Sequence, residues 1–260
     1  ALALALQDTG ISSLLLEARG VPEKDEDPRP LALSHGSHLI LHRLGVWSKL
    51  AKKTPITTIH ISNRGSFGQT VLTPEDAGVP ALGFVVNYHD LFCSMHQRLT
   101  ASTAGYITGA IVTRLETTEN LGTVHFDYQG KEQTVTAQLL VLADGGKLAR
   151  QLPDITYQTH DYHQYAVVAN IKAQKKQTGI AYERFTADGP VALLPNDEDF
   201  ALVWTVSPEA VQEITSLGDS DFLLRLHRHF GDRLGKFMHA GKRSAFPLTL
   251  KHAISTTSQR

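Results

Sequence analysis

The stretch Leu139-Leu140-Val141-Leu142-Ala143-Asp144-Gly145-Gly146 is where the sequence indicates its fold class. Five apolar residues in succession are typical of a parallel strand that is covered on both faces. The run stops at Asp144, and two glycines follow, which let a backbone approach a ligand closely. In open α/β sheets, ligands bind beyond the carboxyl ends of such strands. We therefore predict a ligand-binding carboxylate at Asp144, with a simple turn or helix cap as the alternative.

The amino-terminal segment has a similar character. Residues 1–7 are typical of the last turns of a helix, and residues 11–17 of a buried strand that ends in Glu17. In a dinucleotide-binding fold, an acidic residue about 20 positions after the glycine loop accepts hydrogen bonds from a ribose. No G-x-G-x-x-G motif occurs in the chain. An exposed loop carboxylate is therefore the alternative for Glu17.

The segment between these two strands alternates helix and strand patterns. Residues 20–30 are charged and broken by prolines, which is typical of a loop, and Arg29 stands between two of the prolines. A guanidinium fixed in this way suits a pyrophosphate, although most single arginines in loops are merely solvated. Spacing of apolar residues predicts helices over 34–50 and 87–100, paired strands over 56–63 and 69–73, and a strand meander over 107–117, 122–128 and 133–142.

The pattern changes after a break at Pro153. Short strands are predicted over 164–171, 180–186, 191–194 and 200–206, followed by a helix over 219–230 and a strand over 237–246. The whole chain is thus predicted to be α/β, with a nucleotide-binding layer up to about residue 150 and a mostly antiparallel sheet after it. Two such lobes imply a ligand-binding cleft.

Composition excludes several classes of function. The chain has 260 residues and a net charge of −1, and its basic residues form no run, so we predict no nucleic-acid binding. The lone Cys93 makes an internal disulfide impossible and indicates a reducing compartment such as the cytoplasm. No apolar run approaches the roughly 20 residues of a membrane span, so at most peripheral membrane contact is expected. The 13 histidines include no H-E-x-x-H motif, and surface positions rather than metal ligands are expected for them.

The order of several motifs resembles a known family. Four segments are similar to flavoprotein aromatic monooxygenases related to p-hydroxybenzoate hydroxylase. They are Leu16-Glu17-Ala18-Arg19, Arg29 to Ser34, Leu44 to Trp47 and Val141 to Gly146. The later stretches narrow the resemblance to the hydroxylases of polyprenylated methoxyphenols in ubiquinone biosynthesis. These stretches are 165–171, 182–186 with Gly189-Pro190, 202–204, 233–236 and 239–248.

This resemblance implies an incomplete FAD-binding Rossmann-like domain plus a mostly antiparallel substrate-binding sheet with helices. The implied domains are 1–60 with 84–152 for FAD, and 61–83 with 153–260 for the substrate. FAD would contact Glu17 through its adenosine ribose, Arg29 through its phosphates and Asp144 through its ribityl chain. His89 stands where the family often has an arginine on the flavin side, and the backbone of Val112 would contact the adenine.

The implied reaction is hydroxylation of a polyprenylated phenol ring, with NAD(P)H as the reductant and O2 as the co-substrate. No catalytic side chain is assigned, because the flavin carries the chemistry. One apolar face of the later sheet, around Leu193 and Leu202, is expected to contact the lipid tail. Other ubiquinone-biosynthesis proteins are expected partners, and a cytoplasmic, membrane-associated location is expected.

The family has a glycine loop before the position of Ala1 and a second flavin-binding segment after that of Arg260. From the sequence we therefore expect a fragment truncated at both ends, inactive by itself, that does not hold FAD tightly. Two other interpretations stay open: a non-catalytic binding module, and another flavin oxidoreductase on the same scaffold, such as a halogenase or reductase.

Overall fold

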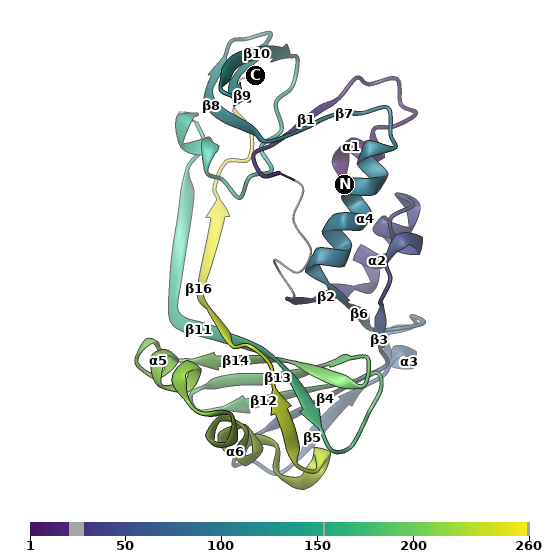
Figure 1. Cartoon of the computed structure of the whole chain (residues 1–260), viewed down its shortest axis with the longest axis vertical. Coiled ribbons are helices and arrows are strands. Elements are labelled where there is room, and N and C mark those ends of the chain that lie inside the picture. The colour runs from purple at the N-terminus through teal and green to yellow at the C-terminus, as the bar shows by residue number, and fades with distance from the viewer. Residues whose placement is uncertain (21–28, 153, 259–260) are drawn as a thin grey trace. The chain divides into compact units, whose positions relative to one another are not determined.

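The computed structural model describes residues 1–20, 29–152 and 154–258 (Figure 1). The chain forms two compact units. The first contains residues 1–24, 95–160 and 249–260, and the second contains residues 25–94 and 161–248. Most of the predicted loop at 20–30, and Pro153 itself, lie outside the described residues. The two units are defined by contacts within the chain, whereas the predicted domains are defined by binding of FAD or of the substrate. The predicted domain boundaries therefore stay a prediction.

A short parallel sheet begins the first unit. β1 pairs with β7, and Glu17 is the register partner of Thr108. The predicted helix over residues 1–7 is present as a single turn, α1, before β1. The elements are α1 (Leu2–Ala5), β1 (Leu14–Glu17), α4 (Tyr88–Thr100) and β7 (Gly105–Thr108). Of α4, only the residues from Met95 onward belong to this unit.

The predicted meander is the second sheet of this unit. Its strands are β8 (Ala110–Thr117), β9 (Gly122–Tyr128) and β10 (Lys131–Ala137), in the order β10-β9-β8. The turn between β9 and β10 is tight, because Gln129 and Gly130 have φ values of 56° and 74°. Two left-handed residues in succession suit a tight hairpin with the native strand twist. Phe126 and Val124 of β9 are buried in the core that this sheet shares with β1 and β7.

The prediction of a buried parallel strand at 139–143 is wrong. The segment is not assigned as a strand, and no strand of the described chain pairs with it. Leu140 and Leu142 pack into the core, but Leu139 and Val141 are 68% and 58% exposed. The physical reason is that a central strand needs a hydrogen-bonded neighbour and cover on both faces, and this segment has cover on one face only. A short 3-10 helix, η2 (Leu148–Gln151), follows it.

The second unit begins with a small three-stranded sheet. Its strands are β2 (Pro30–Ser34), β3 (Thr54–Ile56) and β6 (Gly83–Asn87), with β6 in the centre. The predicted helix at 34–50 is shorter than expected, because α2 (His35–Arg43) ends before Gly45, whose φ of 69° is left-handed. Ser34 caps α2 by accepting a hydrogen bond from the backbone nitrogen of Ser37 at 3.1 Å. A 3-10 turn, η1 (Trp47–Lys49), follows.

An eight-stranded sheet dominates the second unit (Figure 1). Its order is β15-β11-β14-β13-β12-β4-β5, with β16 also paired to β11. The pairing of β4 with β12 is parallel, whereas those of β11 with β14 and β15, of β13 with β12 and β14, and of β4 with β5 are antiparallel. The strands are β4 (Thr58–Asn63), β5 (Gln69–Leu72), β11 (Tyr157–Ala173), β12 (Ile180–Thr186), β13 (Gly189–Asn196), β14 (Asp199–Val206), β15 (Phe237–Ala240) and β16 (Ser244–Ala253). Besides α2 and η1, the helical elements of this unit include α3 (Pro74–Ala77), α5 (Pro208–Ser216), α6 (Asp219–Phe230) and η3 (Gly231–Leu234).

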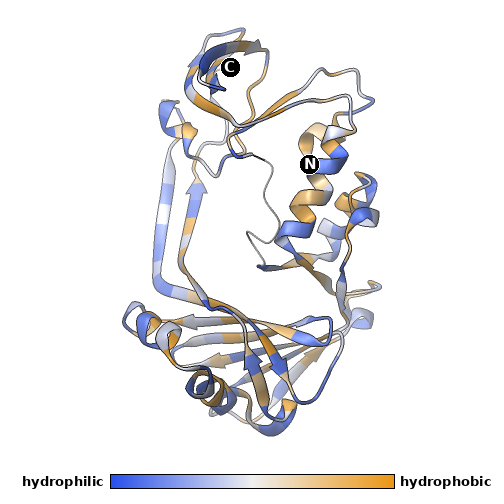
Figure 2. Cartoon of the chain, in the orientation of Figure 1, coloured by the Kyte–Doolittle hydropathy of each residue, from blue (hydrophilic) through white to orange (hydrophobic). Residues whose placement is uncertain are grey.

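One face of the large sheet packs against α5 and α6. Leu193 of β13 and Leu202 of β14 are fully buried there, in one core with Phe222 and Leu226 of α6. Figure 2 shows hydrophobic residues along these strands. The expectation that Leu193 and Leu202 contact a lipid tail is therefore wrong, because successive residues of a strand point to opposite faces and these two point to the helices.

The opposite face of the large sheet is covered only in part. At one end, Ala181 of β12 and Leu194 of β13 pack against Val85 of β6 and Ile56 of β3. Further along the strands, the register places apolar residues and Glu183 on this face, together with the polar side chains of Asn63, Thr70 and Thr205. We call the open face the set Ile59, Ile61, Leu72, Glu183, Phe185, Ala192, Val203 and Val168.

Candidate functional site

Glu17 ends β1, as predicted, and its carboxylate has a local partner. Oε1 accepts hydrogen bonds from the backbone nitrogen and from Nε of Arg19, at 3.0 and 3.1 Å. The side chain of Glu17 is 28% exposed. A carboxylate that is partly desolvated and oriented by an arginine is well placed to accept further hydrogen bonds, for example from ribose hydroxyls.

Two further polar side chains lie near Glu17 that the sequence did not indicate. The Tyr106 hydroxyl on β7 lies 3.2 Å from Nδ1 of His96 on α4. Burial raises the pKa of Tyr106, and the negative charge of Glu17 raises it further. The alternation Gly105-Tyr106-Ile107-Thr108 is a weak signal, because a tyrosine in a strand is usually a packing residue. Its use as a polar neighbour of Glu17 depends on the pairing of β1 with β7.

Asp144 orders its own loop. Oδ1 accepts a hydrogen bond from the backbone nitrogen of Gly146 at 2.8 Å, and Oδ2 accepts one from that of Leu148 at 2.7 Å. Within the chain, Asp144 therefore acts as a turn or helix cap, which was the alternative to a ligand-binding carboxylate. Gly145 and Gly146 have φ values of 73° and 78°, which favour glycine. A Cβ on Gly146 would lie 2.7 Å from the Tyr157 hydroxyl, whereas Gly145 adjoins open space.

Val112 lies on β8, which is the edge strand of the meander sheet. The register of β8 shifts between Val112 and Arg114, which marks a β-bulge. Next to the bulge, the side chain of Gln151 hydrogen-bonds to the carbonyl oxygen of Thr113 and to the backbone nitrogen of Leu115, at 3.2 and 2.9 Å. The edge of β8 thus accepts amide partners, which is the kind of contact an adenine ring makes.

Arg29 lies in the second unit, between two aromatic rings. Its guanidinium carbon is 4.9 Å from the ring centre of Phe246 and 5.4 Å from that of Tyr88. Its carbonyl oxygen accepts a hydrogen bond from the backbone nitrogen of Tyr88 at 2.9 Å. Stacking on aromatic rings holds the planar guanidinium while its edge N–H groups can still donate. Arg29 is nevertheless exposed, so its role as a guanidinium for a pyrophosphate stays a prediction.

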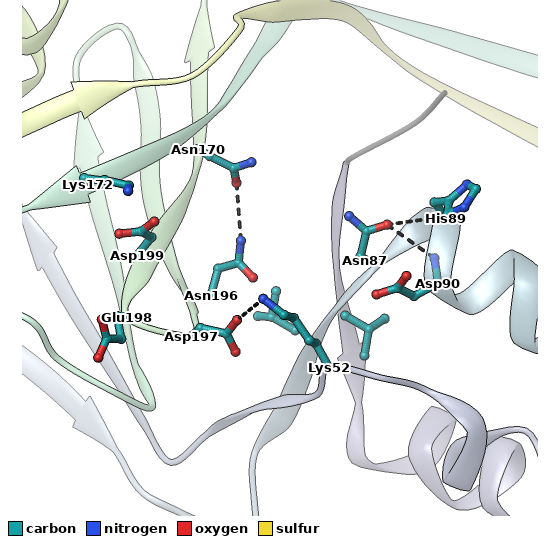
Figure 3. A pocket seen from close by; sticks show the side chains of 12 residues that line it. Lys52, Asn87, His89, Asp90, Asn170, Lys172, Asn196, Asp197, Glu198 and Asp199 are labelled. Carbon is teal, nitrogen blue, oxygen red and sulfur yellow. Dashed lines mark hydrogen bonds and ion pairs between the residues drawn. The ribbon is translucent and has the colours of Figure 1, made fainter. Parts of the chain in front are cut away.

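A cavity of about 620 Å³ lies in the second unit, beside His89 (Figure 3). At the start of α4, the Asn87 side chain accepts hydrogen bonds from the backbone nitrogens of His89 and Asp90, at 2.8 and 3.3 Å. Across the cavity, Lys52 pairs with Asp197 at 2.8 Å. The lining of the cavity is mostly polar. It comprises Lys52, Val85, Val86, Asn87, His89, Asp90, Asn170, Lys172, Asn196, Asp197, Glu198 and Asp199.

The ring of His89 has a neighbour on its own helix, because Nε2 lies 3.3 Å from the sulfur of Cys93. Burial, followed by the charge of Asp90, raises the pKa of the Cys93 thiol. His89 therefore faces the cavity with a neutral thiol at one ring nitrogen. This arrangement suits hydrogen bonding to a polar ligand better than metal binding. Within the described residues, no group of three or more His, Cys, Asp or Glu side chains is placed to hold a metal ion.

The predicted FAD contacts divide between the two units. Glu17, Val112 and Asp144 belong to the first unit. Leu16 precedes Glu17, Leu142 lies two residues before Asp144, and both leucines pack in the same core as Val112. Arg29 and His89 belong to the second, close together because Arg29 contacts Tyr88. The chemical groups of these residues suit the parts of FAD. A carboxylate can accept hydrogen bonds from a ribose, an edge strand can contact an adenine, and a guanidinium can pair with phosphates. Convergence of Glu17, Arg29 and Asp144 on one groove stays a prediction.

Comparison with solved structures gives the class of the fold. The p-nitrophenol 4-monooxygenase of Pseudomonas putida superposes with a TM-score of 0.72, at 12% identity, over 97% of this chain and 65% of that one. The fold is thus p-hydroxybenzoate hydroxylase-like, as the sequence predicted. A model of the FAD binding domain matches residues 1–251. The chain belongs to the FAD binding domain family.

Two relatives narrow the resemblance within this family. The ubiquinone hydroxylase UbiL of Rhodospirillum rubrum is 30% identical over 260 residues, 97% of this chain and 59% of that protein. The 3-demethoxyubiquinol 3-hydroxylase of Escherichia coli is 26% identical over 267 residues, 98% of this chain and 66% of that protein. The resemblance to ubiquinone-biosynthesis hydroxylases is confirmed. The chain spans about three fifths to two thirds of the length of these curated relatives.

Proposed function

We propose that the protein acts as a FAD-dependent monooxygenase that hydroxylates the aromatic ring of a polyprenylated phenol in ubiquinone biosynthesis. The observation that carries this proposal is the similarity, over nearly the whole chain, to two hydroxylases of that pathway. NADH or NADPH is proposed as the reductant, and O2 as the co-substrate. Another flavin oxidoreductase activity has no specific observation in its favour.

The residues proposed to hold FAD are those with suitable donors and acceptors. Glu17 would accept hydrogen bonds from the adenosine ribose, and the backbone of Val112 would contact the adenine. Arg29 would pair with the pyrophosphate, and the loop after Asp144 would lie against the ribityl chain at Gly145. His89 would contact the flavin ring. When bound and reduced, FAD would activate O2, while the protein would orient the substrate and exclude water.

The substrate has an apolar tail and a polar ring, and the second unit offers a surface for each. The open face presents Ile61, Val203 and Val168 in half-buried positions, which suits an isoprenoid chain. The cavity beside His89 is polar, which suits the ring substituents and the flavin edge. No helix of the described chain is both long and apolar enough to cross a bilayer. We propose a cytoplasmic protein with peripheral membrane contact, where such a substrate resides, and other ubiquinone-biosynthesis proteins as partners.

The test is an assay of the purified protein in its full-length form with FAD, NADH or NADPH, and a 2-methoxyphenol that carries a prenyl tail. We expect O2 consumption that depends on the phenol and a product heavier by one oxygen atom in mass spectrometry. Reductant oxidation without an oxygenated product would instead indicate a reductase. A chlorinated product in the presence of chloride would indicate a halogenase. Absence of both turnover and FAD binding would favour a non-catalytic binding module.

A further inference from the structure

Glu183 is an unusual residue for its place in the fold. It lies in the middle of β12, a strand hydrogen-bonded on both sides, with Ile61 of β4 and Ala192 of β13 as its register partners. Tyr182 and Arg184, its neighbours in sequence, point to the other face, where Tyr182 is buried in the core and Arg184 donates to Ser62 at 3.1 Å. Strand alternation therefore puts the carboxylate of Glu183 on the open face.

The surroundings of this carboxylate are apolar and small. Ala181 and Ala192 are 3% and 9% exposed, so the side chain of Glu183 stands between methyl groups. Ile61 and Val203 complete the floor of the open face. A half-buried carboxylate in such surroundings loses hydration, and burial raises the pKa of Glu183. Burying the Glu183 carboxylate at this position therefore costs free energy of folding.

No compensating partner is present among the described residues. Within them, Glu183 makes neither a side-chain hydrogen bond nor an ion pair, unlike Glu213, which pairs with Arg225. Its oxygen atoms are not sealed off, because they are absent from the set of fully buried unsatisfied atoms. The carboxylate is thus partly dry, unpaired and reachable from the open face. These are the properties of a hydrogen-bond acceptor that can bind a donor group of a ligand.

We propose that Glu183 is a positioning residue that accepts the hydrogen bond of the substrate's phenolic hydroxyl. The inference rests on the proposed function, because it names the contact between that substrate and the open face. The apolar surroundings bind the ring and the first part of the tail without direction, and the carboxylate fixes the rotation of the ring. A carboxylate that accepts this bond also increases the electron density of the ring, which favours attack by an electrophilic oxygen.

The test compares two probes that differ in one hydrogen-bond donor. One is 2-methoxyphenol with a geranyl group at position 6, and the other is its O-methyl ether, which has no hydroxyl. Equilibrium dialysis with saturating FAD gives the dissociation constant of each probe. We expect the wild-type protein to bind the phenol roughly 10- to 100-fold more tightly than the ether. Glu183→Ala should lower this ratio to about 1, and Glu183→Gln, which keeps an acceptor, should give an intermediate ratio.

The matched control is Glu209→Gln, a carboxylate of α5 that is exposed to solvent and lies outside the open face. Its ratio should equal that of the wild type. If Glu183→Ala keeps the wild-type ratio, or if the wild type binds both probes equally, the inference fails while the proposed function stands. If the wild type binds neither probe and hydroxylates no phenol, the proposed function fails as well. Should Glu183→Ala not fold, the nearly isosteric Glu183→Gln decides the result.

Discussion

Arg19 donates two hydrogen bonds to one carboxylate oxygen of Glu17, from its backbone nitrogen and from Nε, at 3.0 and 3.1 Å. Within the described residues, the second carboxylate oxygen of Glu17 makes no hydrogen bond, so it can accept one from a ribose. We predict that Glu17→Ala raises the dissociation constant of FAD roughly 10- to 100-fold, since a hydrogen bond to a charged group is lost. Quenching of flavin fluorescence during titration measures it. Glu116→Ala, which removes an exposed carboxylate paired with Arg114, should change nothing, and an equal effect of both variants would contradict the assignment.

Asp144 should matter for the stability of the first unit even without FAD. Its two amide hydrogen bonds, at 2.8 and 2.7 Å, hold a loop with two left-handed glycines. We expect Asp144→Ala to lower the free energy of unfolding by about 1–3 kcal/mol in urea titrations. Asp127→Ala is the control, because Asp127 accepts from a single amide, that of Gly130, at an exposed turn. A loss no larger than that of the control would show that the loop holds its shape without Asp144.

His229 gives the second unit a pH-dependent stability. Burial, and then the positive charges of Arg64, Arg184 and Arg225, lower the pKa of His229 to about 4, although Asp188 acts in the opposite direction. The unfolded chain, with a histidine pKa of about 6.5, binds the proton more readily. The contribution of His229 is therefore complete above about pH 6.5 and declines as the pH falls toward 4.

The variant His229→Phe isolates this effect, because a phenyl ring can keep the edge-to-face contact with Trp204, whose ring centre is 5.0 Å away. We expect the wild type to lose about 2–3 kcal/mol more than the variant between pH 7 and pH 4.5. Urea unfolding at a series of pH values measures this difference. His163→Ala, a change at an exposed histidine, should follow the wild-type curve. Parallel curves for the wild type and His229→Phe would exclude His229 as the origin.

The two faces of the large sheet should respond differently to truncation. Leu202 is fully buried against the helices, whereas its neighbour Val203 is half-buried on the open face. We expect Leu202→Ala to cost about 2–5 kcal/mol of unfolding free energy, because it leaves a cavity in a packed core. Val203→Ala should cost at most about 1.5 kcal/mol. The outcome that would contradict this picture is an equal loss, since it would mean that both faces are equally packed.

Local patterns in the sequence predicted most individual elements. The helix over 219–230 has the predicted bounds, and the pairing of the strands near 56–63 and 69–73 is confirmed, because spacing and turn residues are local signals. β2 and β6 were not predicted, since each is short and apolar and only their mutual pairing makes them strands. The strand expected at 139–143 was wrong, because hydrophobicity reports burial, and hydrogen-bonded neighbours decide whether a buried segment is a strand.

The candidate site was predictable only where a residue ends an element. Glu17 and Asp144 stand out at the ends of apolar runs, and both prove to be structured carboxylates. Glu183 carries no such signal, because Tyr-Glu-Arg-Phe does not tell which face of a strand is covered by helices. That information comes from the pairing of β12 with β4 and β13 and from the position of α5 and α6.

The parallel ladder between β4 and β12 also limits when the large sheet can form during synthesis of the chain. Ser62 and Arg184, which are partners in it, are 122 residues apart in the chain. During synthesis, this interval takes on the order of ten seconds, and until it ends β4 has only β5 beside it. The hairpin therefore waits at the ribosome with an unpaired edge that other nascent chains can recognise. Closure of such a long loop is slow, so the yield of the folded protein in cells should depend on chaperones that cover this edge.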